Sequence, residues 1–393
     1  MENLFKRTIQ ILLGLFVLVA FVGLWKQEDL KRLLAVNTLF SEEKIVGNFS
    51  HMNAAFLTVP LSRGDGPDSP LPKGESMALP AAADAWIKER AVTSLIVLQE
   101  GQIRHESYHL DTQPEDLRIS WSVAKSFLSA LMGVILDQGA IASLDDPVTK
   151  YVPSLMGGAY DGATIRNVLN MTSGVTFNED YLDYNSDINQ MGRVLALGKS
   201  MDGFTEELTE TFAPAGDIWQ YVSIDTHVIG MVIRGATGRS IPDLMNEHII
   251  GRLEFEAAPH YLSDGEGVAF VLGGLNLRSR DYARFGQMFL QGGKWQGEQV
   301  VPADWIAAST VPSAPTEPGQ RQYGYQWWIA PDAPEGEYFA RGIYGQYIFI
   351  DSARDVVIVL TSADRKFREP GAHRSNIEMF RLLSETAVVA SQS

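Results

Sequence analysis

The sequence predicts an α+β protein, because strand-like segments lie near both ends of the main part of the chain and helical segments lie between them. Alternating or β-branched apolar residues fill residues 93–109 and recur between 323 and 361. Such runs, bounded by turn residues, are typical of strands. Residues 140–264 instead have the spacing of helices and loops. Strands grouped apart from helices favour α+β over an alternating α/β arrangement.

Composition places the chain among ordinary globular proteins. Its 393 residues are 45% hydrophobic and 20% charged, which suits two or three domains or one large domain with insertions. Acidic residues outnumber basic ones by 48 to 32, and a net charge of −16 is the wrong sign for holding a phosphate backbone, so nucleic acid is not an expected partner. Cysteine is absent from the sequence, so any nucleophile is an oxygen or an amine.

Residues 1–25 are predicted to form a membrane anchor. After Lys6 and Arg7 the chain is almost purely apolar over residues 9–25, long enough as a helix to cross most of a bilayer core of about 30 Å. No small-x-small cleavage pattern follows, which favours an uncleaved anchor; cleavage after Ala20 and a buried soluble helix are the alternatives. Basic residues flank both sides, so a periplasmic or extracellular location of the remaining chain is inferred from the signal-like N-terminus alone.

Residues 26–80 are predicted to connect this anchor to the main domain. Leucines at helical spacing come first, and five prolines follow from Pro60 onward. This pattern indicates a helical arm and then a Pro-rich linker. The main domain is expected to cover residues 81–393, with a helical subdomain at about 136–264.

Within the main domain, each element is predicted from its own pattern. Period-two runs on both sides of a Glu-Gly-Gln turn predict a β-hairpin, and apolar residues three and four apart predict helices. The expected strands are residues 93–98, 103–109, 323–329, 344–351 and 356–361. The expected helices run from Ser122 to near Gly139, over residues 279–290 and over residues 375–387.

One motif, His105-Glu-Ser-Tyr-His109, has the H-E-x-x-H form of zinc sites. That chemistry needs both histidines on one turn of a helix, but this motif lies in an alternating run that predicts an edge strand. Residues four apart on a strand are about 13 Å apart at ~3.3 Å per residue, too far to share one zinc ion. No metal site is therefore expected here.

Two S-x-x-K patterns occur, Ser41 to Lys44 and Ser122 to Lys125, whereas the G-x-S-x-G of α/β-hydrolases does not occur. Ser41 begins a charged stretch, where it is expected to cap a helix. Ser122 opens the most apolar helix, so Lys125 shares its face and the helix N-terminus favours developing negative charge. A buried lysine amine has a lowered pKa and can accept a hydroxyl proton. Ser122 is thus the candidate nucleophile; an N-cap serine beside a snorkelling lysine is the alternative.

Two further motifs accompany this one. Tyr221-Val-Ser223 follows a Gly/Pro-containing turn, and Gly342-Ile-Tyr-Gly-Gln346 leads into an apolar strand. In order and spacing, the three motifs resemble those of the serine hydrolases of the class C β-lactamase and penicillin-binding group. Within that group the chain is most similar to the 6-aminohexanoate-dimer (nylon-oligomer) hydrolases and related esterases, roughly over residues 80–385. The resemblance implies a β-lactamase/DD-peptidase-like fold, with an antiparallel sheet flanked by helices and a mainly helical subdomain.

The resemblance also implies roles for the motif residues. Ser122 would be the nucleophile, Lys125 would accept its proton, and Tyr221 would pass the proton to the leaving group. A tyrosine acts as a base only when a cation such as Lys125 stabilises its phenolate. The backbone N–H groups of Ser122 and Ile343 would hold the oxyanion of the tetrahedral intermediate. No metal or organic cofactor is implied.

A set of substrate-contacting residues is implied in the same way. Glu179 and Tyr181 fall on the group's substrate loop, and two neighbouring tryptophans are expected either to wall the acyl site or to be core aromatics. The full set is Glu179, Tyr181, Ser223, Trp327, Trp328, Gly342, Tyr344, Gly345 and Gln346.

Two departures limit what the resemblance implies. Where β-lactamases carry Lys-Thr-Gly this chain has Ala340-Arg341-Gly342, which removes the lysine that orients a β-lactam carboxylate and leaves Arg341 as a partial substitute. Leu272 stands where a relative has a polar substrate contact, so an amide preference is not transferred.

The sequence therefore predicts a membrane-anchored serine hydrolase that acts on a small ester or amide. Two alternatives stay open: a D-Ala-D-Ala carboxypeptidase or weak β-lactamase, and a catalytically inactive relative that binds a ligand. Because esterases, amidases and peptidases share this fold and nucleophile chemistry, the sequence names neither the physiological substrate nor the oligomeric state.

Overall fold

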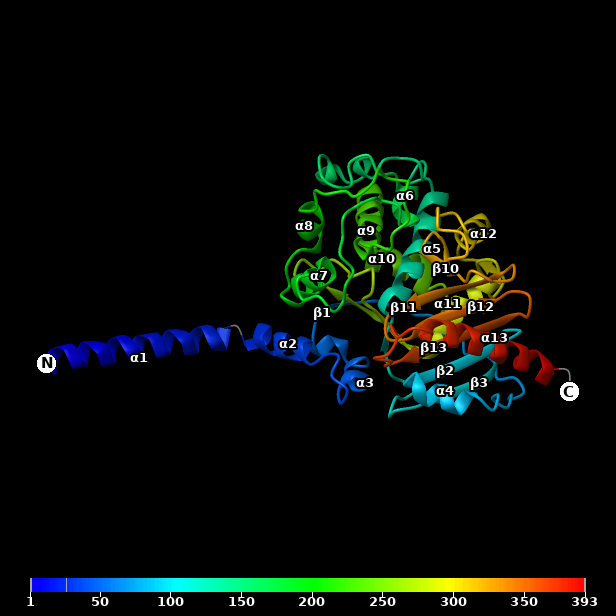
Figure 1. The fold of residues 1–393 in the computed structure, drawn as a ribbon, viewed down its shortest axis with the longest axis horizontal. Helices are drawn as coiled ribbons and strands as arrows, with labels where there is room; N and C mark the ends of the chain where they lie inside the picture. Colours follow the sequence, from blue (N-terminus) through cyan, green and yellow to red (C-terminus); the bar gives the residue numbers. More distant parts are fainter. Residues whose placement is uncertain (1, 26, 392–393) are drawn as a thin grey trace.

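A computed structural model describes residues 2–25 and 27–391, and it confirms the predicted α+β architecture. The central element is a seven-stranded sheet in which every neighbouring pair is antiparallel (Figure 1). In spatial order its strands are β3 (Gln102–Tyr108), β2 (Val92–Gln99), β13 (Val356–Ser362), β12 (Gln346–Asp351), β11 (Glu337–Gly342), β10 (Trp327–Ile329) and β9 (Gln322–Gly324). The predicted hairpin is β2–β3, and β3 is an edge strand as expected.

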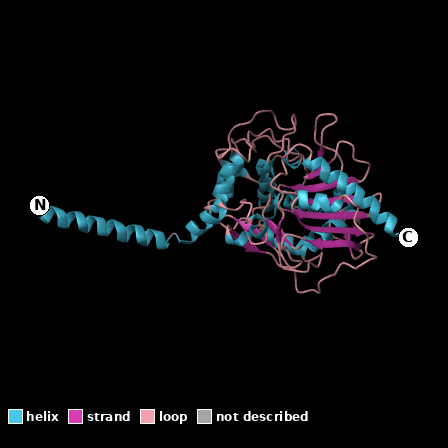
Figure 2. Ribbon diagram, turned by 60° about the horizontal axis from the view of Figure 1, so that its bottom comes forward, coloured by secondary structure: helices cyan, strands magenta, loops and turns pink. Residues whose placement is uncertain are grey.

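Helices cover both faces of this sheet (Figure 2). Helix α11 (Ser279–Leu290) packs on β2, β12 and β13, and helices α4 (Ala83–Glu89) and α13 (Ala372–Ser391) also pack on the sheet. Successive strand residues point to opposite faces. Ile348 accordingly belongs to the same core cluster as Phe285 of α11, whereas Phe349 belongs to the cluster that holds Phe380 of α13. The sheet therefore separates two hydrophobic cores.

The helical subdomain lies beside the sheet and is built around α5 and α9, which pack on each other. Its helices are α5 (Ala124–Asp137), α6 (Ile165–Leu169), α7 (Asp187–Ala196), α8 (Met201–Glu206), α9 (Ser223–Thr237) and α10 (Ile241–Met245), with α12 (Ala303–Ser309) packed against α5 from later in the chain. Short turns of 3₁₀ or π helix are η1 (Met52–Ala54), η2 (Trp121–Val123), η3 (Val148–Lys150), η4 (Pro153–Leu155) and η5 (Asn246–Ile250). The close approach of α12 to α5 depends on Gly133, because a Cβ atom there would lie 2.3 Å from the Trp305 ring.

A smaller antiparallel sheet joins the N-terminal region to the main domain. Its strands, in spatial order, are β1 (Leu57–Pro60), β5 (His260–Ser263), β6 (Leu275–Leu277) and β4 (Arg118–Ile119); a separate hairpin pairs β7 (Lys294–Trp295) with β8 (Glu298–Gln299). Strand β4 ends two residues before η2, so this sheet leads the chain directly into the start of α5.

Three helices precede β1: α1 (Glu2–Trp25), α2 (Gln27–Asn37) and α3 (Ile45–Asn48). Helix α1 extends away from the rest of the molecule (Figure 1). It covers the segment in which the sequence predicts a transmembrane span, but among the described residues no helix is long and apolar enough to cross a membrane. Part of the expected span, residues 17–20 and 22–25, lies outside the residues whose side chains are described.

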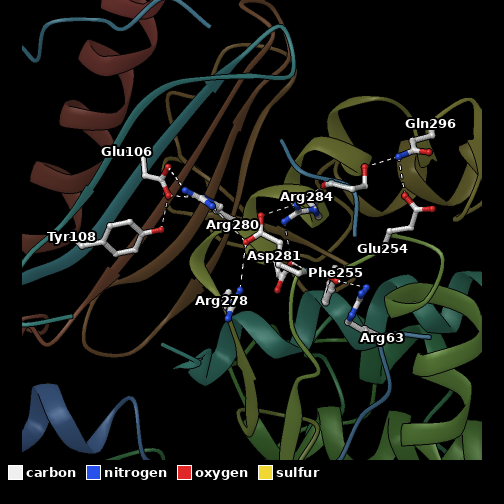
Figure 3. Close-up of polar contacts among 12 residues, drawn as sticks. Arg63, Glu106, Tyr108, Glu254, Phe255, Arg278, Arg280, Asp281, Arg284 and Gln296 are labelled. Atoms are coloured by element: carbon white, nitrogen blue, oxygen red, sulfur yellow. Dashed lines mark hydrogen bonds and ion pairs between the residues drawn. The ribbon is translucent and has the colours of Figure 1, made fainter. Parts of the chain in front are cut away.

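The Pro-rich linker follows the surface of the main domain and is held by a network of charged side chains (Figure 3). The fully buried guanidinium of Arg284 donates from Nε to the carbonyl oxygen of Ser69 at 2.8 Å. The same guanidinium pairs with Asp281 at 3.0 Å and with Glu256 at 2.9 Å. Because the carbonyl oxygen of Ser69 is held by a buried arginine that is itself fixed by two carboxylates of the main domain, this part of the linker has a fixed course.

Two predicted strands differ from those observed. Residues 323–329 form the hairpin β9–β10 rather than one strand, because Tyr325 and Gln326 have positive φ values of 22° and 73° and reverse the chain. The glycine-rich motif at Gly342 leads into β12 as predicted, but that strand begins at Gln346 rather than at residue 344, and the motif also forms the turn from β11, with Gly342 paired to Gln346. Strand β11, which the sequence analysis missed, is thereby placed beside η2.

Candidate active site

The S-x-x-K motif lies where η2 passes into α5. Ser122 is half-buried in η2, and Lys125 lies in the first turn of α5 with only 1% of its surface exposed. Residues three apart on a helix share a face, so both side chains belong to the same side of this segment. The Nζ atom of Lys125 donates a hydrogen bond to the carbonyl oxygen of Leu272 at 3.0 Å. The helix thus begins two residues later than the sequence predicts, but the motif keeps the expected relation.

Burial gives Lys125 the electrostatics of a base. Desolvation lowers the pKa of its amine to about 7, while the carboxylates of Glu179 and Asp225 act in the opposite direction. A lysine with a pKa of about 7 is neutral for a large part of the time near neutral pH, and a neutral amine can accept a proton. The local environment therefore supports the role that the sequence predicts for this residue.

Tyr221 lies two residues before the start of α9, and its ring lies beside the amine of Lys125. Its ring stacks on Trp328 with centroids 5.3 Å apart, and the Nζ atom of Lys125 lies 5.5 Å from the Tyr221 centroid. Burial and the charge of Glu179 raise the pKa of the phenol, whereas a hydrogen bond with Ser122 and the charge of Arg341 lower it. Because the raising effects dominate, the phenol keeps its proton, and the phenolate expected from the sequence is not the favoured form here.

Glu179 connects the substrate loop to the start of α9. One of its carboxylate oxygens accepts the backbone N–H of Ser223, and the other accepts the hydroxyl of Tyr181 at 3.2 Å. Ser223 is the first residue of α9, where a helix dipole favours a negative charge. Burial nevertheless raises the pKa of Glu179, and the charge of Lys125 opposes this rise. The structure thus brings Glu179, Tyr181 and Ser223 together beside the S-x-x-K motif.

The turn after β11 lies against the backbone of η2. A Cβ atom on Gly342 would lie 2.6 Å from the carbonyl oxygen of Ser120 and 3.1 Å from the backbone nitrogen of Ser122. Only a glycine permits this approach, which places the end of β11, one residue before Ile343, against the backbone of Ser122. Two backbone N–H groups from neighbouring segments are what an oxyanion hole requires.

The remaining predicted substrate residues fall into two groups. Tyr344 is half-buried in the turn after Ile343, and Trp328 lies under Tyr221, so both border the site. Gln346 instead stabilises the turn, since its side-chain amide donates to the carbonyl oxygens of Ile343 and Tyr344, both at 3.2 Å. Further residues serve the fold. Gly345 has a φ of 85°, and Trp327, fully buried, packs on Phe289 and Tyr338 in the other core, away from Tyr221.

Comparison with known proteins decides the family. The beta-lactamase family matches residues 83–378 of this chain. The chain belongs to the beta-lactamase family. A 6-aminohexanoate-dimer hydrolase from Paenarthrobacter ureafaciens is 29% identical over 333 residues, which cover 80% of this chain and 84% of that protein. These findings confirm the resemblance indicated by the motifs, and they identify the protein as a serine-type hydrolase of the beta-lactamase fold.

Solved structures of other proteins show the same fold. A Bacillus anthracis protein that carries the name of a 6-aminohexanoate-dimer hydrolase superposes with a TM-score of 0.77 at 21% identity, covering 88% of this chain and 95% of that one. The octameric penicillin-binding protein homologue from Pyrococcus abyssi gives a TM-score of 0.57 at 19% identity, covering 76% of this chain and 75% of that one.

In this beta-lactamase family member the first four residues of the H-E-x-x-H motif lie on strand β3, as predicted, and His109 directly follows the strand. Both histidines contact the hydroxyl of Ser107, at 2.9 Å from His105 and 3.0 Å from His109. Glu106 faces elsewhere and forms an ion pair with Arg280 (Figure 3), with one oxygen 2.7 Å from Nε and the other 2.8 Å from Nη2. Among residues 2–25 and 27–391, no group of three or more His, Asp or Glu side chains is arranged to hold a metal ion.

Three residues make contacts in the site region that the sequence analysis did not predict. Asp225 is fully buried on α9 and accepts the hydroxyl of Tyr160 at 2.7 Å; burial raises its pKa to about 7. Leu272 contributes its carbonyl oxygen to Lys125, and the guanidinium of Arg321 lies 5.5 Å from the centroid of the Trp328 ring. The position of Asp225, two residues after the Tyr-x-Ser motif, was a usable signal, but backbone oxygens and cross-strand neighbours leave no trace in a sequence.

Proposed function

We propose that the protein cleaves small esters or amides through an acyl-enzyme formed on Ser122. The observation that carries this proposal is the environment of Lys125, a fully buried amine with a pKa lowered to about 7, three residues from a half-buried serine. A structural lysine has no need of such burial, which costs free energy unless it serves a purpose. Tyr221 supplies a protonated phenol in the same space.

In the proposed reaction, neutral Lys125 accepts the proton of the Ser122 hydroxyl as its oxygen forms a bond to the substrate carbonyl carbon. The N–H groups of Ser122 and Ile343 stabilise the resulting oxyanion. When the bond to the leaving group breaks, Tyr221 donates its proton to that group and regains one from Lys125. Water then attacks the acyl-enzyme, and the same residues act in reverse to release the acid and restore Ser122.

The proposed substrate class is broader than the 6-aminohexanoate dimers for which a relative is named. The Paenarthrobacter ureafaciens relative is named for the hydrolysis of 6-aminohexanoate dimers, so linear amides of this kind are the first amides to test. The side chain of Leu272 is apolar and almost fully buried, and it supplies no polar contact to an amide substrate. We therefore propose esters and amides with an uncharged acyl group near this position.

The test is turnover of a short-chain p-nitrophenyl ester by the full chain and by the variants Ser122→Ala and Lys125→Ala. Loss of the nucleophile or of the base from a hydrolytic site lowers kcat by factors on the order of 10⁴–10⁶. We expect a burst of p-nitrophenol from the parent, followed by steady turnover, and neither from the two variants. Full activity in Ser122→Ala would refute the assignment of the nucleophile.

The same preparation distinguishes the alternatives left open by the sequence. A penicillin-binding carboxypeptidase or weak β-lactamase would be labelled by a reporter penicillin at Ser122, although Arg341 replaces the lysine that orients a β-lactam carboxylate. A catalytically inactive relative would bind ligand equally well in the parent and in Ser122→Ala and would give no burst.

We further propose, from the signal-like N-terminus alone, that the catalytic domain is periplasmic or extracellular. A compartment-sensitive reporter fused after residue 393 tests this location directly. A cytoplasmic signal would overturn the proposal.

A further inference from the structure

A short segment between α2 and β1 lies against the backbone of the candidate oxyanion hole. We define this N-terminal arm as residues 38–50. The ring of Phe40 stacks on Tyr344, with centroids 4.9 Å apart and planes inclined by 14°. The fully buried ring of Phe49 meets Tyr344 edge-on at 5.4 Å and Trp121 edge-on at 5.5 Å. Two phenylalanines of the arm therefore contact the same two aromatic residues of the main domain.

Those two aromatic residues flank the two candidate oxyanion donors. Trp121 directly precedes Ser122, and Tyr344 directly follows Ile343. Both have left-handed backbone conformations, with φ of 42° for Trp121 and 57° for Tyr344. A bulky residue in this region is strained and persists only where its surroundings hold it in place. The peptide that carries the N–H of Ser122 begins at Trp121, and Tyr344 lies in the turn that holds Ile343, so the backbone around both N–H groups depends on contacts made by these side chains.

Hydrogen bonds fix the arm itself to the start of the catalytic segment. The backbone N–H of Ile119, three residues before Ser122, donates to the carbonyl oxygen of Phe49 at 3.1 Å. Buried Arg118 donates from Nη1 to the carbonyl oxygen of Val46 and to the hydroxyl of Ser50, both at 2.7 Å. The arm is therefore attached to the same strand that leads into η2, and it does not simply pass over the surface.

Tyr344 also contacts Phe367 of the main domain, with ring centroids 4.7 Å apart. Of the two arm phenylalanines, Phe40 is the more informative to change, because 38% of its surface is exposed and its removal leaves the core filled. Phe49 is completely buried, so its replacement by alanine would create a cavity and destabilise the fold.

We propose that the N-terminal arm positions the oxyanion hole, with Phe40 as a positioning residue that acts through Tyr344 and Trp121. The inference rests on the proposed function, because an oxyanion hole has meaning only if Ser122 forms an acyl-enzyme. Phe40 does not touch the reacting atoms. Its aromatic contacts hold the two left-handed residues, and thereby the N–H groups of Ser122 and Ile343, in the geometry that binds a tetrahedral intermediate.

The experiment compares full-length Phe40→Ala with the parent, using a p-nitrophenyl ester and a boronic acid that forms a tetrahedral adduct with a serine nucleophile. Removing an oxyanion donor outright costs about 10²–10³ in kcat. Loosening both donors should cost less, and we expect kcat to fall by about tenfold with KM within twofold of the parent. Affinity for the boronic acid should fall by the same factor as kcat, and the midpoint of the pH profile should not move.

Two further variants make the result specific. Phe40→Tyr keeps the stacked ring and should restore kcat. Leu382→Ala removes an apolar side chain of equal exposure, 38%, from α13, and should leave kcat and boronic-acid affinity unchanged. The inference is overturned if Phe40→Ala retains the parent kcat, if KM alone rises, or if Leu382→Ala has the same effect.

The parent and Ser122→Ala separate failure of this inference from failure of the proposed function. If turnover does not depend on Ser122, the proposed function fails and the inference fails with it. If turnover depends on Ser122 and is undiminished in Phe40→Ala, the inference alone is wrong.

Discussion

The Nζ atom of Lys125 lies 5.5 Å from the centroid of the Tyr221 ring, so an amine with a lowered pKa and a phenol with a raised pKa share one site. Burial lowers the pKa of the amine to about 7, and burial together with Glu179 raises the pKa of the phenol. Near neutral pH the amine is therefore ready to accept a proton, while the phenol still holds one to give. Environments that separate two titratable groups in this way identify the base and the acid of a reaction.

The first prediction concerns the pH dependence of kcat/KM. Lys125 acts only when neutral, and its pKa in the folded protein is about 7. Ester hydrolysis should therefore rise with pH through about 7 and level off above it, a direction opposite to that expected for a catalytic acid of the same pKa. The measurement is kcat/KM from pH 5.5 to 9 with correction for spontaneous hydrolysis. A profile without a rising limb in this range would contradict the role of Lys125.

The second prediction separates proton donation by Tyr221 from its packing. Tyr221→Phe keeps the ring on Trp328 but removes the proton donor, and loss of general acid–base assistance typically costs 10²–10⁴-fold in rate. The loss should be large for alkyl esters and amides and smaller for p-nitrophenyl esters, since p-nitrophenolate leaves without protonation. Equal losses for both substrate types would argue against leaving-group protonation.

Tyr323→Phe is the matched control for this variant. Tyr323 also packs on Trp328, at 4.9 Å, and its buried hydroxyl has no hydrogen-bond partner within the described part of the chain. Removing a hydroxyl that makes no hydrogen bond should leave activity unchanged and stability unchanged or slightly higher.

The third prediction tests the contact between the turn after β11 and η2. In Gly342→Ala the added Cβ atom would lie 2.6 Å from the carbonyl oxygen of Ser120 and 3.1 Å from the nitrogen of Ser122. Both neighbours are backbone atoms, so η2 or β11 must shift, and we expect kcat to fall by about tenfold or more while KM changes little. Steady-state kinetics on the folded variant provide the measurement.

Gly192→Ala is the control for the effect of an added methyl group. Gly192 lies within α7, and a Cβ atom there would have no neighbour within 4 Å. Alanine at a helix position is favoured over glycine by roughly 1 kcal/mol, so this variant should be fully active and slightly more stable. An equal loss of activity in both glycine variants would show that the effect does not arise from the close approach of Gly342 to the backbone of η2.

Particular elements show how far the sequence could predict this structure and where it could not. Helix α11 occurs at the predicted residues because its apolar positions have a clear helical period, and the β2–β3 hairpin follows from two alternating runs around a Glu-Gly-Gln turn. By contrast, β11 was missed, because residues 337–342 have no clear period-two pattern that sets them apart from a loop, although the Gly342 motif does lead into β12 at Gln346.

The candidate site divides in the same way. Its chemistry was predictable because Ser122, Lys125 and Tyr221 lie in recognisable motifs, and the structure brings them together. The contacts that hold these residues in position were not predictable. The contact of Phe40 with Tyr344 joins residues far apart in the sequence, and the hydrogen bond from Lys125 to Leu272 uses a backbone oxygen that any residue would provide.

The last prediction concerns stability and the network that holds the linker. Arg284 is fully buried and forms an ion pair with Asp281. Burial raises the pKa of Asp281 to about 7, and the charge of Arg284 opposes this rise. Arg284→Met leaves that carboxyl without its cation, and breaking a buried pair typically costs 3–5 kcal/mol. The pKa of Asp281 then rises further. Since a carboxyl with a raised folded-state pKa loses stability as pH increases, the destabilisation should be larger at pH 8 than at pH 5.

Urea unfolding of the parent, Arg284→Met and Arg252→Ala at both pH values measures this effect. Arg252 forms an exposed pair with Glu298, with side chains 40% and 75% exposed, so its loss should cost about 1 kcal/mol or less at either pH. The parent, measured at the same two pH values, sets the reference for both variants. An Arg284→Met variant as stable as Arg252→Ala, or one whose destabilisation shrinks as pH rises, would show that this buried network contributes little to stability.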